Sequence, residues 1–453
     1  MRGNKQSFWE KSIETYRNKV ALRRFLSLFS TDVLVRGANF LLIPVFLHLM
    51  TREEFGVYGY LYSFAMAMSL VFTLGFHASV PKLFADTKND KKAQGSMLFT
   101  LSLTLVVGLI VIFSLLSFTG IDEYFFSFIN RNNDVSGFSY DTYRPYLFVA
   151  MASMVLSNLL TYYFVAAEKI KNIQAFNLIR FFFANGLAII LLYTAANADA
   201  ALLRLAITYL VELILCGVFA IFLCKNFTLK FSSYYLRKGL KIGLPLSFVA
   251  LLNAITNFGD KHFVMLYCGV GVVAVYNLAS LLATIPVIVY QSFNFIWLPS
   301  FLQEKNLSLL KKKTDRNGLR IFILLLLLCV GIYIGAWILL NWGVFPKSYS
   351  LIMSILPPLC LAQIFASLNL FFFNYFTYFE KNYITILTSV IINGLSYFLF
   401  SFTAPIYGEI GVAYSLLLSN FTLFVIYYLL SSYYVKKSIK NNSLDKNKDK
   451  TFC

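Results

Sequence analysis

Long apolar stretches alternate with short polar segments along almost the whole chain. A helix needs ~20 mostly apolar residues to cross a bilayer, and by that rule the sequence predicts twelve membrane-spanning helices. They are centred near Val35, Ala67, Val106, Met154, Leu187, Leu213, Leu251, Ile285, Leu328, Leu361, Ile391 and Leu423. The alternating polarity of membrane-spanning strands is not seen. The pattern therefore predicts an all-α polytopic membrane protein.

The composition agrees with this pattern. Of the 453 residues, 58% are hydrophobic and only 13% are charged, and the mean hydropathy is +0.69. A soluble protein of this length needs far more polar surface. The six cysteines lie mostly inside apolar stretches without paired spacing. We interpret them as small core residues, and expect neither a disulfide framework nor a metal site.

The placement of the formal net charge of +18 indicates topology. Lys and Arg gather before the first predicted span, in every second loop and after the last span, whereas the other loops are short or acidic. Cytoplasmic loops of membrane proteins carry this excess. We therefore expect both termini in the cytoplasm and no nucleic-acid partner. The leader 1–20 is either an amphipathic cytoplasmic helix or a disordered tail.

The two halves of the sequence repeat each other. At an offset of 218, Asn39 aligns with Asn257, and Tyr58 of "EEFGVYGYLYS" aligns with the tyrosine of "GVVAVYNLASL". Further along, Pro145 matches a proline at an offset of 212, and the "NGL" at Asn185 recurs at an offset of 208. A run of matches in the same order, with a slowly drifting offset, indicates an internal duplication.

The repeat predicts two bundles of six helices. Because six is an even number, both bundles share one orientation in the membrane, and transporters of this kind bind substrate between the halves. We expect a basic cytoplasmic leader at residues 1–20 and an N-terminal bundle at 21–225. A basic linker at 226–238 leads to a C-terminal bundle at 239–436 and a basic tail at 437–453.

Specific motifs connect the chain with a known family. "NFLLIPVFLHLMTREEFGVY" contains a proline near the end of the first span and a T-x-E-x-[FY]-G-x-Y turn, and the second half has "GLPLSF", "NFGDKHFVM" and "NFIWLP". Over about residues 21–435 the sequence resembles the polysaccharide-transporter branch of the MOP superfamily, the Wzx-type O-antigen flippases. The resemblance implies a MATE-like, V-shaped carrier of about twelve helices.

The resemblance also implies a function. Such a carrier moves undecaprenyl-pyrophosphate-linked oligosaccharide from the inner to the outer leaflet of the bacterial cytoplasmic membrane by alternating access, for O-antigen, capsule or similar polysaccharide biosynthesis. The pathway's polymerase and chain-length regulator stay open as further partners beside the lipid bilayer. The alternatives are a MATE-type ion-coupled exporter and a membrane enzyme of the same pathway, a polymerase or glycosyltransferase. We expect a non-catalytic transporter, because the longest outer loop has only two arginines and no catalytic motif appears.

Charged residues inside the first span are candidate substrate contacts. A charge at bilayer depth costs roughly 2.5–3.5 kcal/mol on insertion scales, so it normally faces an aqueous cavity or a partner. Asp32, Arg36 and Asn39 lie at i, i+4 and i+7, which places them on one helical face. Arg36 would present a cation to a pyrophosphate or sugar acid, with Asp32 orienting it. The alternative is a structural Asp32–Arg36 pair at the interface.

The seventh span carries a second polar stripe. Asn253, Asn257, Asp260 and Lys261 follow one face in the outer third of the span. In the functional interpretation Asn257 and Lys261 contact an anionic head group and Asp260 takes up a coupling ion or proton; in the structural one the pair only stabilises the cavity. His262 points about 100° further round and is the weakest candidate.

Two further charges lie alone in the fifth and sixth spans. Arg180 is a candidate substrate contact, against a snorkelling interfacial arginine, and Glu212 is a candidate ion-coupling carboxylate without a visible partner. No cofactor or metal is expected. Coupling to a proton or sodium gradient, or pull by polymerisation, stays open.

Overall fold

The structure is a computed structural model, and all its elements in the described part of the chain are helices. The described residues are 35, 37–88, 90–129, 139–195, 198–224, 227, 229–304, 306–379, 381 and 383–450. Asp32, Arg36 and the leader 1–20 therefore lie outside the described residues. The predicted all-α membrane fold is confirmed.

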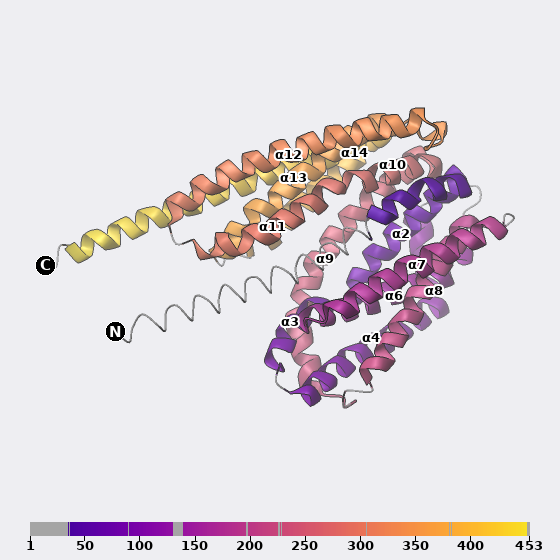
Figure 1. Ribbon diagram of the computed structural model, residues 1–453, viewed down its shortest axis with the longest axis horizontal. Helices are drawn as coiled ribbons and strands as arrows, with labels where there is room; N and C mark the ends of the chain where they lie inside the picture. The colour runs from indigo at the N-terminus through magenta and orange to yellow at the C-terminus, as the bar shows by residue number, and fades with distance from the viewer. Residues whose placement is uncertain are drawn as a thin grey trace. The chain divides into compact units, whose positions relative to one another are not determined.

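The helices follow one another with short connections (Figure 1). After a short apolar helix, Gly37–Leu49, they are α2 Arg52–Phe72, α3 Phe76–Asp86, α4 Lys91–Thr119, α5 Ile121–Ile129, α6 Tyr140–Ala166, α7 Ile170–Thr194, α8 Ala200–Cys224, α9 Ser233–Cys268, α10 Val270–Ala283, α11 Ile285–Gln303, α12 Leu307–Asn341, the 3₁₀ turn η1 Lys347–Tyr349, α13 Ile352–Tyr378 and α14 Tyr383–Lys450.

Within the described residues, nine helices are long and apolar enough to cross a membrane, or ten if α9, broken between Pro245 and Ala250, is one span. This count is lower than the twelve membrane-spanning helices predicted from the sequence. Two predicted spans share α14, where Gly408 has non-helical backbone angles and separates two merged helices. The first predicted span is described only as the short helix Gly37–Leu49. The chain is a multi-pass membrane protein, and twelve spans remain a prediction.

The helix boundaries repeat with the offsets seen in the sequence. α2 starts at Arg52 and α10 at Val270, an offset of 218. α6 and α13 both have 27 residues and start 212 residues apart. The side chains of Asp90 and Asn306 cap the N-termini of α4 and α12, where each accepts hydrogen bonds from backbone N–H groups. The duplication is therefore present in the helices and in their caps.

The first compact unit comprises the described residues of Met1–Met50, Ser69–Asp122 and Tyr140–Ser247. In it α6, α7 and α8 lie side by side, and α3 and α4 pack on α6 (Figure 1). Its core includes the fully buried Phe76, Leu101 and Val155. Only 22% of the apolar window of α7 is buried, as expected where lipid covers the other side.

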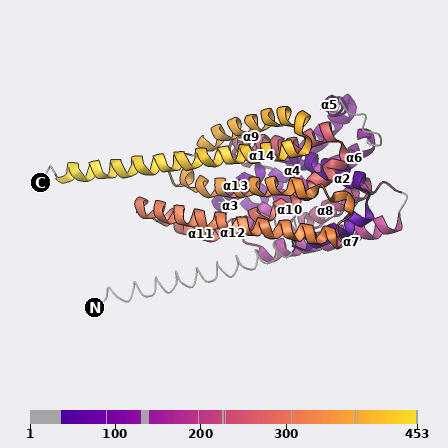
Figure 2. The same ribbon diagram turned by 90° about the horizontal axis from the view of Figure 1, so that it is seen from above.

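The second compact unit comprises the described residues of Thr51–Met68, Glu123–Ser139 and Phe248–Cys453. Here α12, α13 and α14 run along one another (Figure 2), and α13 also packs on α10 and α11. The unbroken run of buried residues 273–279 shows that α10 is enclosed on all sides. Each unit combines segments that are far apart in sequence. The boundaries expected for the two six-helix bundles, 21–225 and 239–436, remain a prediction.

Candidate functional site

Asp260 and Lys261 of α9 form a buried ion pair in the second unit. Their side chains are only 7% and 13% exposed, and Lys261 Nζ lies 3.3 Å from Asp260 Oδ1. Oδ1 also accepts a hydrogen bond from the backbone N–H of Lys261 at 2.7 Å, and Oδ2 accepts one from the hydroxyl of Tyr276 at 3.4 Å. Consecutive helix residues normally point in different directions. Here the lysine folds back to reach its neighbour.

Lys261 also extends along the predicted polar stripe. Its ammonium donates to the backbone carbonyl of Asn257 at 3.2 Å, one turn earlier. Asp260 lies eight residues before the end of α9, or about 12 Å by the helical rise. The stripe thus holds an ammonium between a carboxylate and a carbonyl, near the C-terminal end of α9. That this end faces the outer side of the membrane remains a prediction. The side chain of Asn253 lies outside the described part of the chain.

His262 has a packing role that its position in the sequence did not show. The residue is 8% exposed, its Nδ1 lies 3.1 Å from the hydroxyl of Tyr60, and its ring stacks on Phe258. Tyr60 lies in α2, whose residues up to Met68 belong to this second unit. His262 therefore joins α9 to α2.

Arg180 and Glu212 form a charged pair in the first unit. Arg180 Nη1 on α7 lies 2.9 Å from Glu212 Oε1 on α8. The carboxylate side chain is 6% exposed and that of the arginine 38%. The guanidinium also lies over the ring of Phe176, 5.8 Å from its centroid. A buried carboxylate thus fixes one side of a guanidinium whose side chain is still partly accessible.

Two amides link the first span to the fifth in the same unit. The side chain of Asn185 on α7 donates to Asn39 Oδ1 at 3.2 Å and to the carbonyl of Phe181 at 3.0 Å. Asn39 itself is exposed. Asn39 is therefore held in place by a neighbouring helix, and its side chain faces outward from the packed helices.

The second unit contains an equivalent link. Asn393, the repeat partner of Asn185, accepts a hydrogen bond from the hydroxyl of Thr256 at 2.5 Å. Thr256 precedes Asn257, the repeat partner of Asn39, and Asn257 is exposed. Each unit thus joins the helix of its polar stripe to the helix four spans further along. The repeated "NGL" was the available signal for this contact, although the sequence did not indicate its partner.

The structure brings some predicted site residues together and leaves others apart. It joins Arg180 with Glu212 and Asp260 with Lys261, and it places Asn39 and Asn257 on exposed positions of separate units. Tyr276 and Asn185 were not predicted as site residues. Among the described residues, no group of three or more His, Cys, Asp or Glu side chains could hold a metal ion.

Comparison with solved structures defines the class of fold. The lipid II flippase MurJ in an inward closed conformation matches with a TM-score of 0.69 and 15% identity, over 89% of this chain and 87% of that one. An inward-facing multidrug resistance MATE family transporter of the MOP superfamily matches with a TM-score of 0.63 and 14% identity, over 90% and 99%. The chain has the helical fold shared by these MOP-superfamily transporters.

The sequence identifies the family within this class. Residues 21–305 match the family described as polysaccharide biosynthesis protein, and this is more than half of the chain. No curated protein matches the chain in sequence. The chain belongs to the polysaccharide biosynthesis protein family, so the resemblance stated from its motifs is confirmed.

Proposed function

We propose that the chain is a flippase for undecaprenyl-pyrophosphate-linked oligosaccharide. It moves repeat units of a surface polysaccharide from the inner to the outer leaflet of the bacterial cytoplasmic membrane by alternating access, with both termini in the cytoplasm. Support comes from the family match, from the fold shared with a lipid II flippase, and from the Lys and Arg content of alternate loops.

One observation carries the proposal: each unit holds a cation beside a buried carboxylate inside an apolar helix. Charges at this depth are costly without a partner or a polar ligand. Arg180 is fixed by Glu212, with 38% of its side chain exposed. Guanidinium groups bind phosphate and carboxylate with two parallel hydrogen bonds. In the proposed function Arg180 contacts the pyrophosphate or a sugar acid, and Asn39 adds an amide to the polar surface.

Lys261 has a different role in the proposal, because its ammonium is already engaged by Asp260 and the Asn257 carbonyl. An anionic cargo competes with Asp260 for this ammonium. Uptake of a proton or a sodium ion by Asp260 would weaken the pair and release Lys261. Binding of the coupling ion and binding of the cargo are thereby linked through one carboxylate, and Glu212 can act in the same way on Arg180.

The MATE comparison favours a second candidate, an ion-coupled exporter of small molecules, since a MATE transporter covers 90% of the chain with a TM-score of 0.63. The family match favours the oligosaccharide cargo, because it links the sequence to polysaccharide biosynthesis. The two candidates differ in what accumulates in the cell when the protein is removed. A missing flippase leaves lipid-linked repeat units at the inner leaflet, whereas a missing exporter leaves surface polysaccharide unchanged.

The test is complementation of a deletion strain. We expect Arg180→Gln to reach the membrane in normal amounts, to abolish surface polysaccharide, and to accumulate lipid-linked repeat units. Arg180→Lys keeps the charge but loses the forked donors, so it restores export only in part. Lys238→Gln is the matched control, because it removes a cation of the same unit from an exposed pair with Asp86 at 2.9 Å.

In this strain Lys238→Gln should export as the wild type does. Normal export by Arg180→Gln would refute the role of the arginine. Normal surface polysaccharide in the deletion strain itself would refute the cargo and would leave the exporter as the better assignment.

A further inference from the structure

α12 is much longer than its apolar part. It begins with "LSLLKKKTDRNGLR", residues 307–320, and continues with the apolar "IFILLLLLCVGIYIGAWILLN" to Asn341. The apolar part alone, with 21 residues, is long enough to cross a bilayer. The first fourteen residues therefore extend about 21 Å beyond it along the same helix.

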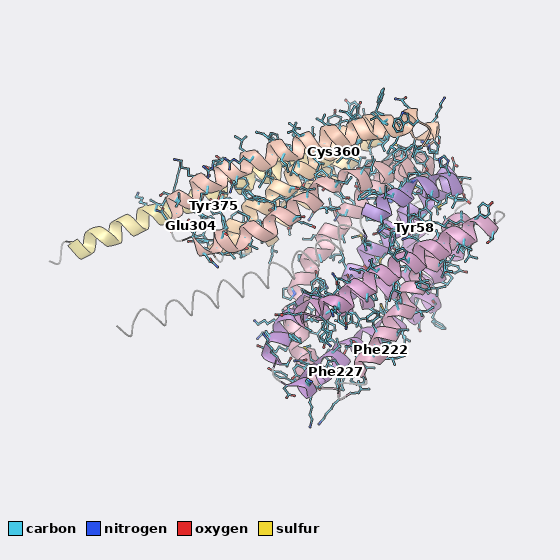
Figure 3. The ribbon with its side chains drawn as sticks, in the orientation of Figure 1. Tyr58, Phe222, Phe227, Glu304, Cys360 and Tyr375 are labelled. Carbon is cyan, nitrogen blue, oxygen red and sulfur yellow. The ribbon has the colours of Figure 1, made fainter. Side chains whose placement is uncertain are left out.

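Some of the cations on this extension are bound within the protein. Lys311 donates to the Ser432 hydroxyl at 2.8 Å and lies 3.5 Å from Asp315. Lys313 lies 2.7 Å from Glu304, which Figure 3 labels near the end of α11. These two lysines hold α12 against the neighbouring segments of its own unit.

The other cations face away from the protein. Lys312, Arg316 and Arg320 are exposed and follow one another at intervals of four residues, on one side of α12. Within the described residues, no hydrogen bond or ion pair is found for these three side chains. The opposite side of the helix is buried through Leu310, Thr314 and other residues. The described part of the protein leaves the three outward charges uncompensated.

The three outward cations, Lys312, Arg316 and Arg320, are followed along α12 by exposed aliphatic side chains of the kind that face lipid. Leu319, Ile323, Leu324 and Leu327 are 47–67% exposed and continue the same outer side of α12. Three cations in a row next to an exposed aliphatic surface match an amphiphile with an anionic head and apolar tails. From Lys312 to Arg320 the helix rises about 12 Å, which is enough to cross the ~5–8 Å headgroup layer of one leaflet.

We propose that Lys312, Arg316 and Arg320 form a binding site for the phosphate headgroup of an anionic phospholipid. The acyl chains of this lipid lie along Leu319, Ile323, Leu324 and Leu327. The site is separate from the Asp260–Lys261 and Arg180–Glu212 pairs, and it does not depend on what the protein transports. Its occupant is a structural lipid of the surrounding bilayer, selected by charge.

The test compares two double variants on the same turns of α12. Lys312→Gln with Arg316→Gln removes two outward charges, and Lys311→Gln with Lys313→Gln removes two inward ones. The full-length protein in dodecyl maltoside micelles is titrated with dioleoyl phosphatidylglycerol, and lipid-bound and free protein are counted by native mass spectrometry. Dioleoyl phosphatidylcholine, with the same acyl chains, is the neutral control lipid.

We expect phosphatidylglycerol to bind wild-type protein in preference to phosphatidylcholine. The outward double variant should lose about 30-fold in affinity for phosphatidylglycerol, since each basic residue near an anionic surface contributes about fivefold. The inward double variant should stay within about threefold of wild type. Lys312→Arg with Arg316→Lys keeps both charges and should bind as wild type, which separates loss of charge from loss of folding.

Two results would overturn the site. Equal losses in the outward and inward variants would show that only the overall charge of the surface matters. Equal binding of phosphatidylglycerol and phosphatidylcholine by the wild type would show that the cations do not select the lipid.

Discussion

Replacing Asp260 with Asn removes one charge from the buried pair while it keeps the size of the side chain. Lys261 would then be a cation that is 13% exposed, with the Asn257 carbonyl as its remaining strong acceptor. At the 3.3 Å separation of the pair, Coulomb's law gives roughly 5 kcal/mol for an effective dielectric constant of 20. Desolvation of both groups offsets part of this energy. We expect Asp260→Asn to lower the free energy of unfolding by about 3 kcal/mol.

The assay is thermal unfolding of the purified protein in detergent, followed by tryptophan fluorescence. A loss of about 3 kcal/mol corresponds to a melting temperature lower by about 6–12 °C for a unit of roughly 200 residues. Asp86→Asn is the matched control, because it removes the carboxylate of an even closer pair with Lys238, at 2.9 Å, in which Lys238 is 31% and Asp86 47% exposed. Exposed pairs contribute about 0–1 kcal/mol, so this variant should melt within about 4 °C of wild type.

The double variant Asp260→Asn with Lys261→Gln sharpens the test. Lys261→Gln alone leaves a buried carboxylate and should cost about as much as Asp260→Asn. The double variant leaves no unpaired charge, so it should be more stable than the sum of the single losses predicts, by about 2–3 kcal/mol. Additive losses, or equal shifts for Asp260→Asn and Asp86→Asn, would refute the interpretation of a tightly coupled buried pair.

Two further predictions concern His262 and Glu304. His262→Phe keeps the packing and loses only the contact with Tyr60, so the free energy of unfolding should fall by about 1 kcal/mol. Export in the deletion strain should be normal. Loss of export by a variant that reaches the membrane in normal amounts would contradict the packing role. Glu304 lies outside the spans, and the hydrogen bond from Lys313, with a second from the Asn306 N–H, lowers its pKa below the ordinary 4.5. A carboxyl group whose pKa is lower in the folded state than in the unfolded state stabilises the fold at pH values above its unfolded-state pKa. This stabilisation is lost as the pH falls through the folded-state pKa. The melting-temperature difference between wild type and Glu304→Gln should therefore be constant above pH 4.5 and shrink below it; a difference that grows in acid would contradict the pairing.

The helices and their repeat could be predicted because both are local properties of the chain. A run of about 20 apolar residues is enough to indicate a span, and equal spacing of turn and cap residues is enough to reveal a duplication. The shared 212-residue offset of Pro145 and Pro357 therefore agreed with the starts of α6 and α13. No packing information was needed for either inference.

The pairing of charges could not be predicted in the same way. Arg180 and Glu212 were recognised as candidates because each is costly inside an apolar helix. Their contact joins two helices, and the two residues are 32 positions apart in sequence. Its geometry depends on how each helix is rotated about its axis. The sequence therefore showed no partner for Glu212, and the structure places it 2.9 Å from Arg180.

Tertiary packing also decided the place of His262. Helical periodicity predicts only that it points about 100° away from Lys261. Its neighbour Tyr60 is 202 residues away in sequence, and nothing local marks that contact. Asp260 and Lys261 differ from these cases, because the polar stripe in the sequence already suggested them as a pair. They are adjacent helix residues, and the length of the lysine side chain lets the two charges meet at 3.3 Å.

Transport of a lipid-linked oligosaccharide by the purified protein is the most direct measurement of the proposed function. The protein is reconstituted into proteoliposomes that carry an undecaprenyl-pyrophosphate-linked repeat unit, and a membrane-impermeant glycosidase or oxidant reports the fraction of glycan exposed outside. We predict that wild-type protein makes essentially all of this lipid accessible, while Arg180→Gln leaves about half protected, as empty liposomes do. Equal protection with wild-type protein and without protein would contradict the proposed function.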